Sequence, residues 1–310
     1  MQSLHHRTPL WESRPLSSRL GSQVYLKLEA LQPTGSFKIR GIGRACQISK
    51  SEGAQALVSS SGGNAGYAVA YAGRQLGLPV TVVVPTTTSS LMKDQLRNEG
   101  ATVIQQGSSW DDSHAAAVEL TRDLHAAYIH PFDDPRIWAG HSSLIEEIKQ
   151  AGVIPDIVVL SVGGGGLLCG VLEGMHRIGW QDVPICAVET QGAASFSLSV
   201  RMGKLVTLER ITSLATSLGA RRVASQSLTW TKSHAVIPWE VSDEAAVRAI
   251  LCFADDHKLL VEPACGAALS TAYDRAKPLA DYKTILIVVC GGSGVSRQLI
   301  TQWTSQLGLS

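Results

Sequence analysis

Residues 156–179, "DIVVLSVGGGGLLCGVLEGMHRIG", contain an apolar run, four consecutive glycines and a longer stretch with helical spacing. The run "DIVVL" (156–160) is apolar almost throughout, which is typical of a parallel strand covered by helices on both faces. A strand, a glycine loop and a helix N-terminus together form an anion site, because bare N–H groups and the positive end of the helix dipole converge there. The stretch therefore predicts one βα unit of an α/β fold with an anion bound at its turn.

The same alternation of strand-like and helix-like segments continues along the chain. Alternating βα units imply parallel sheets, so we expect a doubly wound α/β fold. The irregular stretches 29–36 and 130–141 are candidates for crossings between two lobes. They predict a small domain, residues 33–132, inserted in a large domain made of residues 1–32 and 133–310 with the ligand in the cleft between them. Predicted strands lie at residues 24–28, 56–60, 80–84, 102–105, 156–160, 185–189 and 284–289.

Composition narrows the class of partner. Lys+Arg number 27 and Asp+Glu 26 in 310 residues, so no charge excess indicates nucleic acid or an anionic membrane surface, and a small molecule is expected instead. The chain begins without an apolar signal segment, and no apolar run approaches the roughly 20 residues of a membrane span, so we expect a cytoplasmic protein without membrane partners. Its six cysteines form no C-x-x-C pair, which favours reduced, buried thiols over disulfides or zinc.

The glycine loop itself, "GGGGLLCG" (163–170), indicates which anion binds. The dinucleotide fingerprint G-x-G-x-x-G fails in each register, and no G-K-[ST] marks a nucleotide loop. A single phosphate monoester is therefore the better interpretation. The alternative is that these glycines only permit close packing of helix and strand.

Two further loops follow predicted strands. "SSSGGNAG" (59–66) forms a second group of exposed amides, and Ser61 and Asn64 add donors that suit a carboxylate, although such a loop alone is usually only a turn. In "VVCGGSG" (288–294), Cys290 ends a very apolar strand at the carboxyl edge of a sheet, where it is either packing or a neutral thiol facing the crevice.

The segment "QPTGSFKIRG" (32–41) places Lys38 where a helix begins. Ser36 is a candidate N-cap, so the helix is expected to start near Phe37. Lys38 then lies on the apolar face, opposite a polar stripe formed by Arg40, Arg44 and Gln47. The ordinary interpretation is a lysine whose ammonium reaches water. The alternative is a desolvated amine that acts as a base or as a Schiff-base nucleophile.

A reactive lysine, a loop for one phosphate, a carboxylate nest and a polar residue at a strand end are the contacts that a pyridoxal phosphate enzyme needs. The sequence also resembles the serine/threonine dehydratase branch of the fold-type II pyridoxal phosphate enzymes, in order and across nearly the whole chain. The motifs that carry this resemblance are "PTGSFKIRG", "SSGGNAG", "FDDPRIW", "SVGGGGLLCGV", "VEPACGAAL" and "VVCGGS". It implies a tryptophan synthase beta-like fold of two lobes, each with a mostly parallel central sheet flanked by helices.

The resemblance assigns roles to individual residues. It implies that Lys38 carries pyridoxal 5'-phosphate through a Schiff base, with Phe37 against the ring, Asn64 near the ring's 3-oxygen and Cys290 beside its nitrogen. The phosphate would lie against Gly163, Gly164, Gly165, Gly166 and Leu167. The substrate carboxylate would lie against Ser61, Gly62, Gly63, Asn64 and Ala65.

It further implies a homodimer and a monovalent cation, such as K⁺, next to the glycine loop. The cation ligands would be Gly163, Glu189, Ala193, Ser195 and Leu218. Read from the sequence alone, Glu189 could equally be an ordinary acid at a strand rim.

The implied activity is conversion of L-serine, and of L-threonine, to pyruvate or 2-oxobutyrate and ammonia, with Lys38 as the general base. Gly62 favours dehydration over racemisation and is expected to leave extra space at the substrate. The chain ends about 15 residues after the "CGGSG" loop, which favours a catabolic enzyme without a regulatory domain. The alternatives are β-replacement, as in cysteine synthesis, a non-catalytic pyridoxal phosphate or amino acid binding protein, and a nucleotide-binding Rossmann protein.

Overall fold

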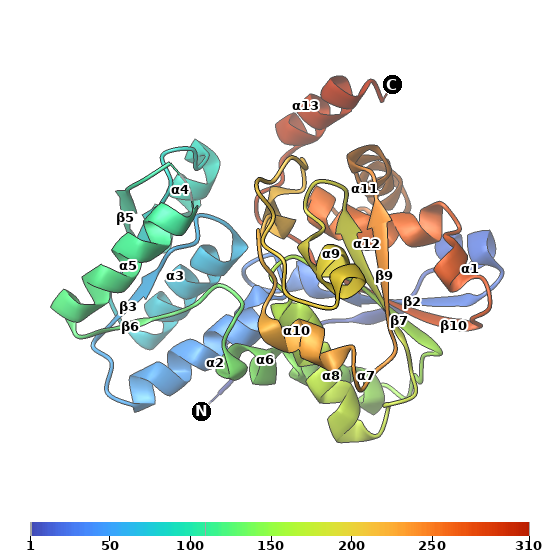
Figure 1. Cartoon of the computed structure of the whole chain (residues 1–310), viewed down its shortest axis with the longest axis horizontal. Helices are drawn as coiled ribbons and strands as arrows, with labels where there is room; N and C mark the ends of the chain where they lie inside the picture. The colour runs from blue at the N-terminus through green and yellow to red at the C-terminus, as the bar shows by residue number, and fades with distance from the viewer. Residues whose placement is uncertain (1, 109, 310) are drawn as a thin grey trace.

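A six-stranded sheet forms the larger half of the protein (Figure 1). The computed structural model describes residues 2–108 and 110–309. All neighbouring strands in this sheet are parallel except the first pair, which is antiparallel. The strands come from both ends of the chain, in the spatial order β1 (Leu10–Glu12), β2 (Gln23–Leu28), β10 (Thr284–Val289), β7 (Ile157–Ser161), β8 (Ile185–Thr190) and β9 (Val236–Val241).

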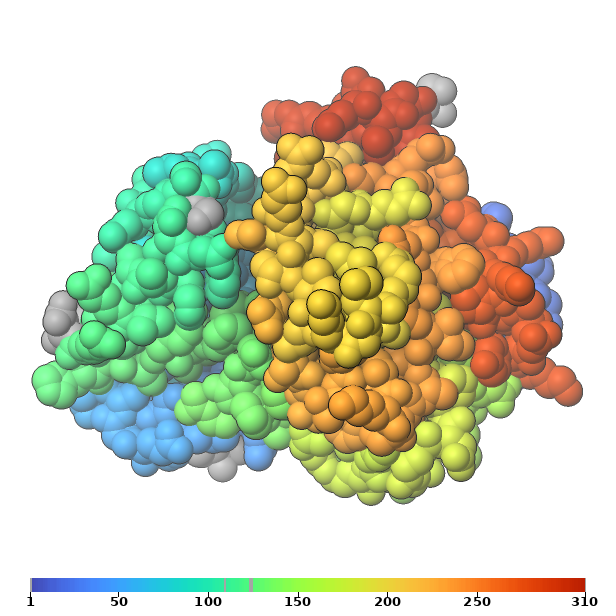
Figure 2. Space-filling view, in the orientation of Figure 1, coloured from blue at the N-terminus to red at the C-terminus, as the bar shows by residue number. Residues whose placement is uncertain are grey.

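A four-stranded parallel sheet forms the smaller half. Its strands lie in the order β5 (Thr102–Gln105), β4 (Val80–Val84), β3 (Ala56–Ser59) and β6 (Ala126–Tyr128). Successive residues face opposite sides, so Leu57 packs with α2 (Lys38–Ser51) and α3 (Asn64–Leu76), whereas Val58 packs with α5 (Trp110–Leu124). Helix α4 (Ser90–Asn98) completes this half, and Figure 2 shows a notch between the two halves at the top of that face.

Helices cover both faces of the large sheet, which explains why its strands are apolar at successive positions. Helix α12 (Pro263–Tyr273) is buried along its length and packs on β7, β8 and β10, with α11 (Asp243–His257) against its other side. No helix among the described residues is both long and apolar enough to span a bilayer. The remaining helices of this half are α1 (Arg14–Leu20), α6 (Pro135–His141), α7 (Ser143–Gln150), α8 (Gly166–Ile178), α9 (Ser195–Met202), α10 (Ser225–Trp230) and α13 (Arg297–Leu307).

The α/β prediction is confirmed, and all seven predicted strands occur within one residue of their predicted ends. Three short or exposed strands, β1, β6 and β9, were not predicted. The stretch 130–141 is also not irregular throughout, because α6 begins after Asp134, whose carboxylate accepts the Arg136 N–H at 2.8 Å. Each sheet lies within one predicted domain, while the boundaries at 32/33 and 132/133 stay a prediction.

The start of α2 differs from the expected helix cap. Ser36 is not the N-cap: the helix begins at Lys38, and the buried Ser36 hydroxyl has no partner in the described chain. The main chain of Ser36 instead pairs with Gly291, and the Phe37 N–H donates to the Cys290 carbonyl at 3.2 Å. This pairing places Lys38 beside the loop that follows β10.

The polar stripe expected on α2 is also wrong at Arg40. Its guanidinium is 1% exposed and binds two carboxylates, Glu29 at 2.6 Å and Glu147 at 2.7 Å. A buried guanidinium is tolerated because both carboxylates neutralise it and accept its N–H groups. Arg40 therefore joins α2 to the end of β2 and to α7 instead of facing water.

Candidate active site

Lys38 is the first residue of α2 and lies where the two halves meet. Its Nζ donates to the Pro131 carbonyl at 2.7 Å and lies 5.3 Å from the centre of the Phe37 ring. Burial lowers the pKa of Lys38 to about 8, because the protein interior disfavours the ammonium. Its amine is therefore far more often neutral near pH 8 than that of an exposed lysine.

Two histidines that sequence reasoning missed lie near this lysine. Burial lowers the pKa of His130 to about 4 and that of His141 well below its usual value, with the Lys38 charge adding to both effects. The His141 ring packs 4.9 Å from the Phe37 ring, and neither of its nitrogens has a partner in the described chain. No ion pair within the described residues neutralises Lys38, whose neighbours here are uncharged imidazoles.

The glycine loop lies between β7 and α8, as predicted. The main-chain N–H groups of residues 163–168 have no acceptor within the described part of the chain. A Cβ on Gly164 would lie 2.2 Å from the Phe132 ring, and one on Gly165 would lie 2.0 Å from the Ser227 hydroxyl. Phosphate binding and close packing are thus compatible interpretations of this loop. Close packing requires glycine at these positions, and the glycines leave the main-chain N–H groups free to bind an anion.

The loop at residues 61–65 lies at the start of α3 and forms a second group of amides. The N–H groups of Gly62, Asn64 and Ala65 have no acceptor among the residues that the structure describes, whereas the Gly63 N–H donates to the Ser61 hydroxyl at 3.3 Å. These donors converge at the carboxyl edge of the small sheet, where a carboxylate can accept them.

The Asn64 side chain spans the two halves. Its Oδ1 accepts from the Ser293 N–H at 2.7 Å, and its Nδ2 lies 3.1 Å from a Glu262 carboxylate oxygen. Glu262, which sequence reasoning missed although it lies in the "VEPACGAAL" motif, is 5% exposed and also accepts from the Ser217 hydroxyl at 2.5 Å and the Gly294 N–H at 2.6 Å. Burial raises the pKa of this carboxyl. A buried acid thus connects loops from both halves around the site.

Gly62 does not leave the extra space that we expected. A Cβ at this position would lie 2.8 Å from the Thr88 side chain and 3.2 Å from that of Val84. The volume that an alanine or a serine would use is therefore already filled by the chain itself. Any effect of Gly62 on the choice of reaction or substrate therefore depends on Thr88 as well.

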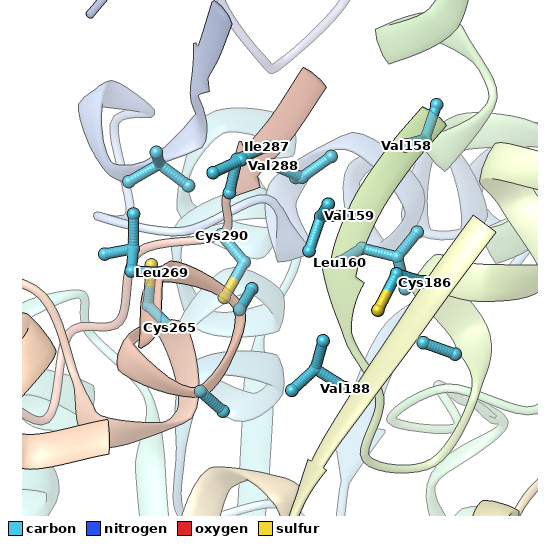
Figure 3. Packing of buried hydrophobic residues seen from close by; sticks show 14 of the residues in the cluster. Val158, Val159, Leu160, Cys186, Val188, Cys265, Leu269, Ile287, Val288 and Cys290 are labelled. Atoms are coloured by element: carbon cyan, nitrogen blue, oxygen red, sulfur yellow. The ribbon is translucent and has the colours of Figure 1, made fainter. Parts of the chain in front are cut away.

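Cys290 lies directly after β10 and is 6% exposed (Figure 3). Its carbonyl anchors the start of α2, as described above. A hydrogen bond with Cys265 of α12 and burial raise the pKa of the Cys290 thiol well above its usual value. The neutral thiol expected from the sequence is therefore the form that this environment favours.

Glu189 is fully buried at the end of β8, so its interpretation as an ordinary rim acid is wrong. Its carboxylate accepts the N–H groups of Phe196 at 2.9 Å and Ser197 at 2.7 Å. Burial nevertheless raises its pKa to about 7, and the buried hydroxyl of Ser195 has no partner in the described chain. The same region includes Leu218, whose Cα would lie 3.0 Å from a Cβ on Gly163.

The arrangement thus brings together a desolvated amine, two groups of bare amides and a neutral thiol, drawn from loops of both sheets. Sequence comparison agrees with this chemistry. Residues 1–291 match the family model described as "Pyridoxal-phosphate dependent enzyme".

Individual relatives are similar to this chain over nearly their whole length. The L-serine dehydratase/L-threonine deaminase of Mus musculus is 47% identical over 322 residues, covering 100% of this chain and 98% of the mouse protein. The serine dehydratase-like protein of Rattus norvegicus is 46% identical over 320 residues, covering 100% and 97%. The crystal structure of an L-serine ammonia-lyase from the fungus Rhizomucor miehei matches with a TM-score of 0.93 and 37% identity, covering 98% of this chain and 99% of that one. The chain therefore belongs to the pyridoxal-phosphate dependent enzyme family, with the fold-type II architecture.

Proposed function

We propose that this protein is a pyridoxal phosphate-dependent L-serine and L-threonine ammonia-lyase. It removes water across the α and β carbons, and the product hydrolyses to pyruvate or 2-oxobutyrate and ammonia. The observation that carries this proposal is the desolvated Lys38 amine, with its pKa lowered to about 8, together with two groups of unpaired amides within residues 62–65 and 163–168. The dehydratase, deaminase and ammonia-lyase names of the relatives favour elimination over β-replacement and over binding without turnover.

The residues present fit pyridoxal 5'-phosphate. The amides of residues 163–168 lack acceptors and begin a helix of 13 residues, which suits a phosphate dianion. Lys38 would hold the cofactor covalently, while Phe37, Asn64 and Cys290 would contact its ring. When bound, the cofactor supplies an electron sink for the negative charge that develops at the substrate α-carbon.

The chain's own residues position the substrate and move the proton. The Ser61 hydroxyl and the unpaired amides of Gly62, Asn64 and Ala65 would hold the carboxylate, with Gly63 between them, and so fix the α-carbon. The Lys38 amine takes the α-proton, for which a pKa near working pH is favourable. The C–O bond then breaks with its electron pair on oxygen, and the hydroxide and the α-proton together make one water. The neutral Cys290 thiol would leave the ring nitrogen of the bound cofactor unprotonated, which would favour elimination over racemisation.

Three finer features belong to the same proposal. A monovalent cation such as K⁺ would bind Glu189 with the backbone of Gly163, Ala193, Ser195 and Leu218. Its support is the buried Glu189 carboxylate and the unpartnered Ser195 hydroxyl near it. We also propose a homodimer, as the family resemblance implies, and a cytoplasmic location, as expected from the sequence.

The proposal is tested by following 2-oxo acid release from a panel of L- and D-hydroxy amino acids, with and without sulfide. We expect pyruvate from L-serine and 2-oxobutyrate from L-threonine, and no sulfur-containing product. Replacement of Lys38 by Ala should lower kcat by at least about 10³-fold, because the base and the cofactor anchor are lost together. Lys50→Ala, on the exposed end of the same helix, is the matched control and should keep wild-type activity. Faster formation of D-serine than of pyruvate would overturn the proposal.

A further inference from the structure

His130 has one ring nitrogen committed to the main chain and the other without a partner. Its Nδ1 accepts the N–H of Phe132 at 3.2 Å and that of Asp133 at 2.7 Å. An imidazole nitrogen that accepts two amides carries no proton, so the ring proton lies on Nε2. Within the described part of the chain, no group accepts this Nε2–H.

His130 lies in the segment that lines the site beside Lys38. The residue follows β6 at the carboxyl edge of the small sheet, and Lys38 Nζ binds the carbonyl of the next residue, Pro131, at 2.7 Å. Its ring lies edge-on at 4.7 Å from Phe132, whose own ring packs directly over Gly164 of the glycine loop. The segment 130–132 therefore runs between the reactive amine and the phosphate loop, and the His130 ring lies close enough to Lys38 for the charge of that lysine to lower its pKa.

The environment keeps this imidazole neutral. Burial, His114 and the Lys38 charge lower its pKa to about 4, and Asp134 opposes this only in part. Protonation would also place a proton on Nδ1, where two amides already point. His130 is thus a fixed hydrogen-bond donor under working conditions and does not act as a proton shuttle.

A hydrogen-bonded aromatic cluster packs around the His130 ring. The Tyr128 hydroxyl lies 2.7 Å from the Ser60 hydroxyl and 2.6 Å from His114 Nδ1, while Trp110 stacks on His114 at 4.9 Å. The rings of Trp110, His114 and Tyr128 all have centres within 6.2 Å of the His130 ring. Ser60 directly precedes the loop that would hold the substrate carboxylate, so the cluster fixes His130 relative to the substrate.

We propose that His130 is a further catalytic residue, which donates its Nε2–H to the β-oxygen of the substrate. The inference rests on the proposed dehydratase function. As the C–O bond breaks, the departing oxygen gains the bonding pair, and a preplaced donor stabilises that charge more in the transition state than in the ground state. The proton on Nε2 is not transferred. The donor therefore favours substrates whose leaving atom is oxygen.

Two variants separate the roles of the two ring nitrogens. His130→Asn places an acceptor near the position of Nδ1 and so retains the two amide contacts, but it lacks the outer donor. His130→Gln places an N–H near the position of Nε2 and so retains the donor. Thermal melting of both variants shows whether each is folded before activity is compared.

Each holoenzyme is assayed with L-serine and with β-chloro-L-alanine, whose chloride leaves without needing a strong hydrogen bond. We expect His130→Asn to lower kcat for L-serine by roughly 10²-fold and kcat for β-chloro-L-alanine by less than about threefold. His130→Gln should recover much of the rate with L-serine. Equal losses with both substrates, or an unchanged rate with L-serine, would overturn the role of His130.

Binding of L-alanine, which has no β-oxygen, gives a readout without turnover. Its dissociation constant, measured from the change in cofactor absorbance, should be the same for wild type and both variants, and a tenfold loss in His130→Asn would indicate a distorted site and overturn the proposal. If the wild type releases pyruvate from β-chloro-L-alanine but not from L-serine, the dehydratase function itself fails, and the role of His130 fails with it.

Discussion

Lys38 shows how a single side chain acquires chemistry from its surroundings. Its amine is buried without a neutralising carboxylate among the described residues, whereas Arg40, two residues later, is neutralised by Glu29 and Glu147. The two basic side chains lie on one helix turn, yet their charge states differ. Arg40 is always charged and stabilises the fold, whereas the pKa of Lys38, about 8, allows its amine to be neutral or charged near working pH.

The lowered pKa predicts how cofactor-free enzyme takes up pyridoxal phosphate. Only the neutral amine condenses with an aldehyde, so the loading rate should rise with pH and level off above about pH 8. Stopped-flow absorbance of the forming Schiff base measures this rate. A rate that continues to rise to the pKa of an ordinary lysine, about 10.4, would contradict the desolvation of Lys38.

The contact between Gly62 and Thr88 predicts a coupled pair of substitutions. Gly62→Ala should lower stability by about 1–3 kcal/mol and also lower kcat/KM, because its Cβ would lie 2.8 Å from the Thr88 side chain. Adding Thr88→Ala removes the contacting atoms and should restore both. Denaturant unfolding and steady-state kinetics of the two single variants and the double variant measure the coupling. Additive effects in the double variant would show that Thr88 does not set the space at Gly62.

At the scale of elements, the strands could be predicted because parallel strands buried on both faces carry apolar residues at successive positions. The segments Val80–Val84 and Thr284–Val289 are of this kind. β9 carries no such signal, since it contains Pro238 and is only partly buried at the sheet edge, and β6 has only three residues. Short edge elements are decided by tertiary contacts instead of by local pattern.

The candidate site was predictable to a similar degree. Glycine loops and the lysine have local signals, so residues 61–65 and 163–167 and Lys38 could be named from the sequence. Glu262 and His130 could not, because a lone acid or histidine has no pattern and its role depends on what the fold brings near it. The prediction of an N-cap at Ser36 was wrong for the same reason, because the main chain of Ser36 pairs with Gly291, which is far away in the sequence.

The buried carboxyl of Glu189, at the end of β8, predicts that stability depends on pH and that this dependence changes with the cation in the buffer. The folded-state pKa of Glu189, about 7, is above its unfolded value near 4.5, so its contribution is present below pH 4.5 and is lost as the pH rises towards 7. The loss is at most about 3 kcal/mol. A bound cation favours the ionised carboxylate and should reduce this loss.

Melting temperatures at pH 5 and pH 8, in potassium chloride and in tetramethylammonium chloride, test this account. We expect the fall from pH 5 to pH 8 to be larger in tetramethylammonium, and the difference between salts to vanish in Glu189→Gln. The same pH dependence in both salts would argue against a cation at Glu189.

At the scale of the whole molecule, the two sheets contribute different parts of one site. The small sheet presents the loop at residues 61–65 and His130, and the large sheet presents the glycine loop, Glu189 and Cys290. Lys38 begins the helix that starts where these loops meet. Because Asn64 bridges to Glu262 and Ser293, the relative placement of the halves is coupled to the side chains that would contact cofactor and substrate.

The central claim, that Lys38 anchors pyridoxal phosphate, is tested most directly by reducing the holoenzyme with borohydride and mapping the modified peptide by mass spectrometry. The account predicts a single phosphopyridoxyl adduct on Lys38, present in Lys50→Ala and absent from Lys38→Ala. An adduct on another lysine, or a reduced protein that carries none, would contradict it.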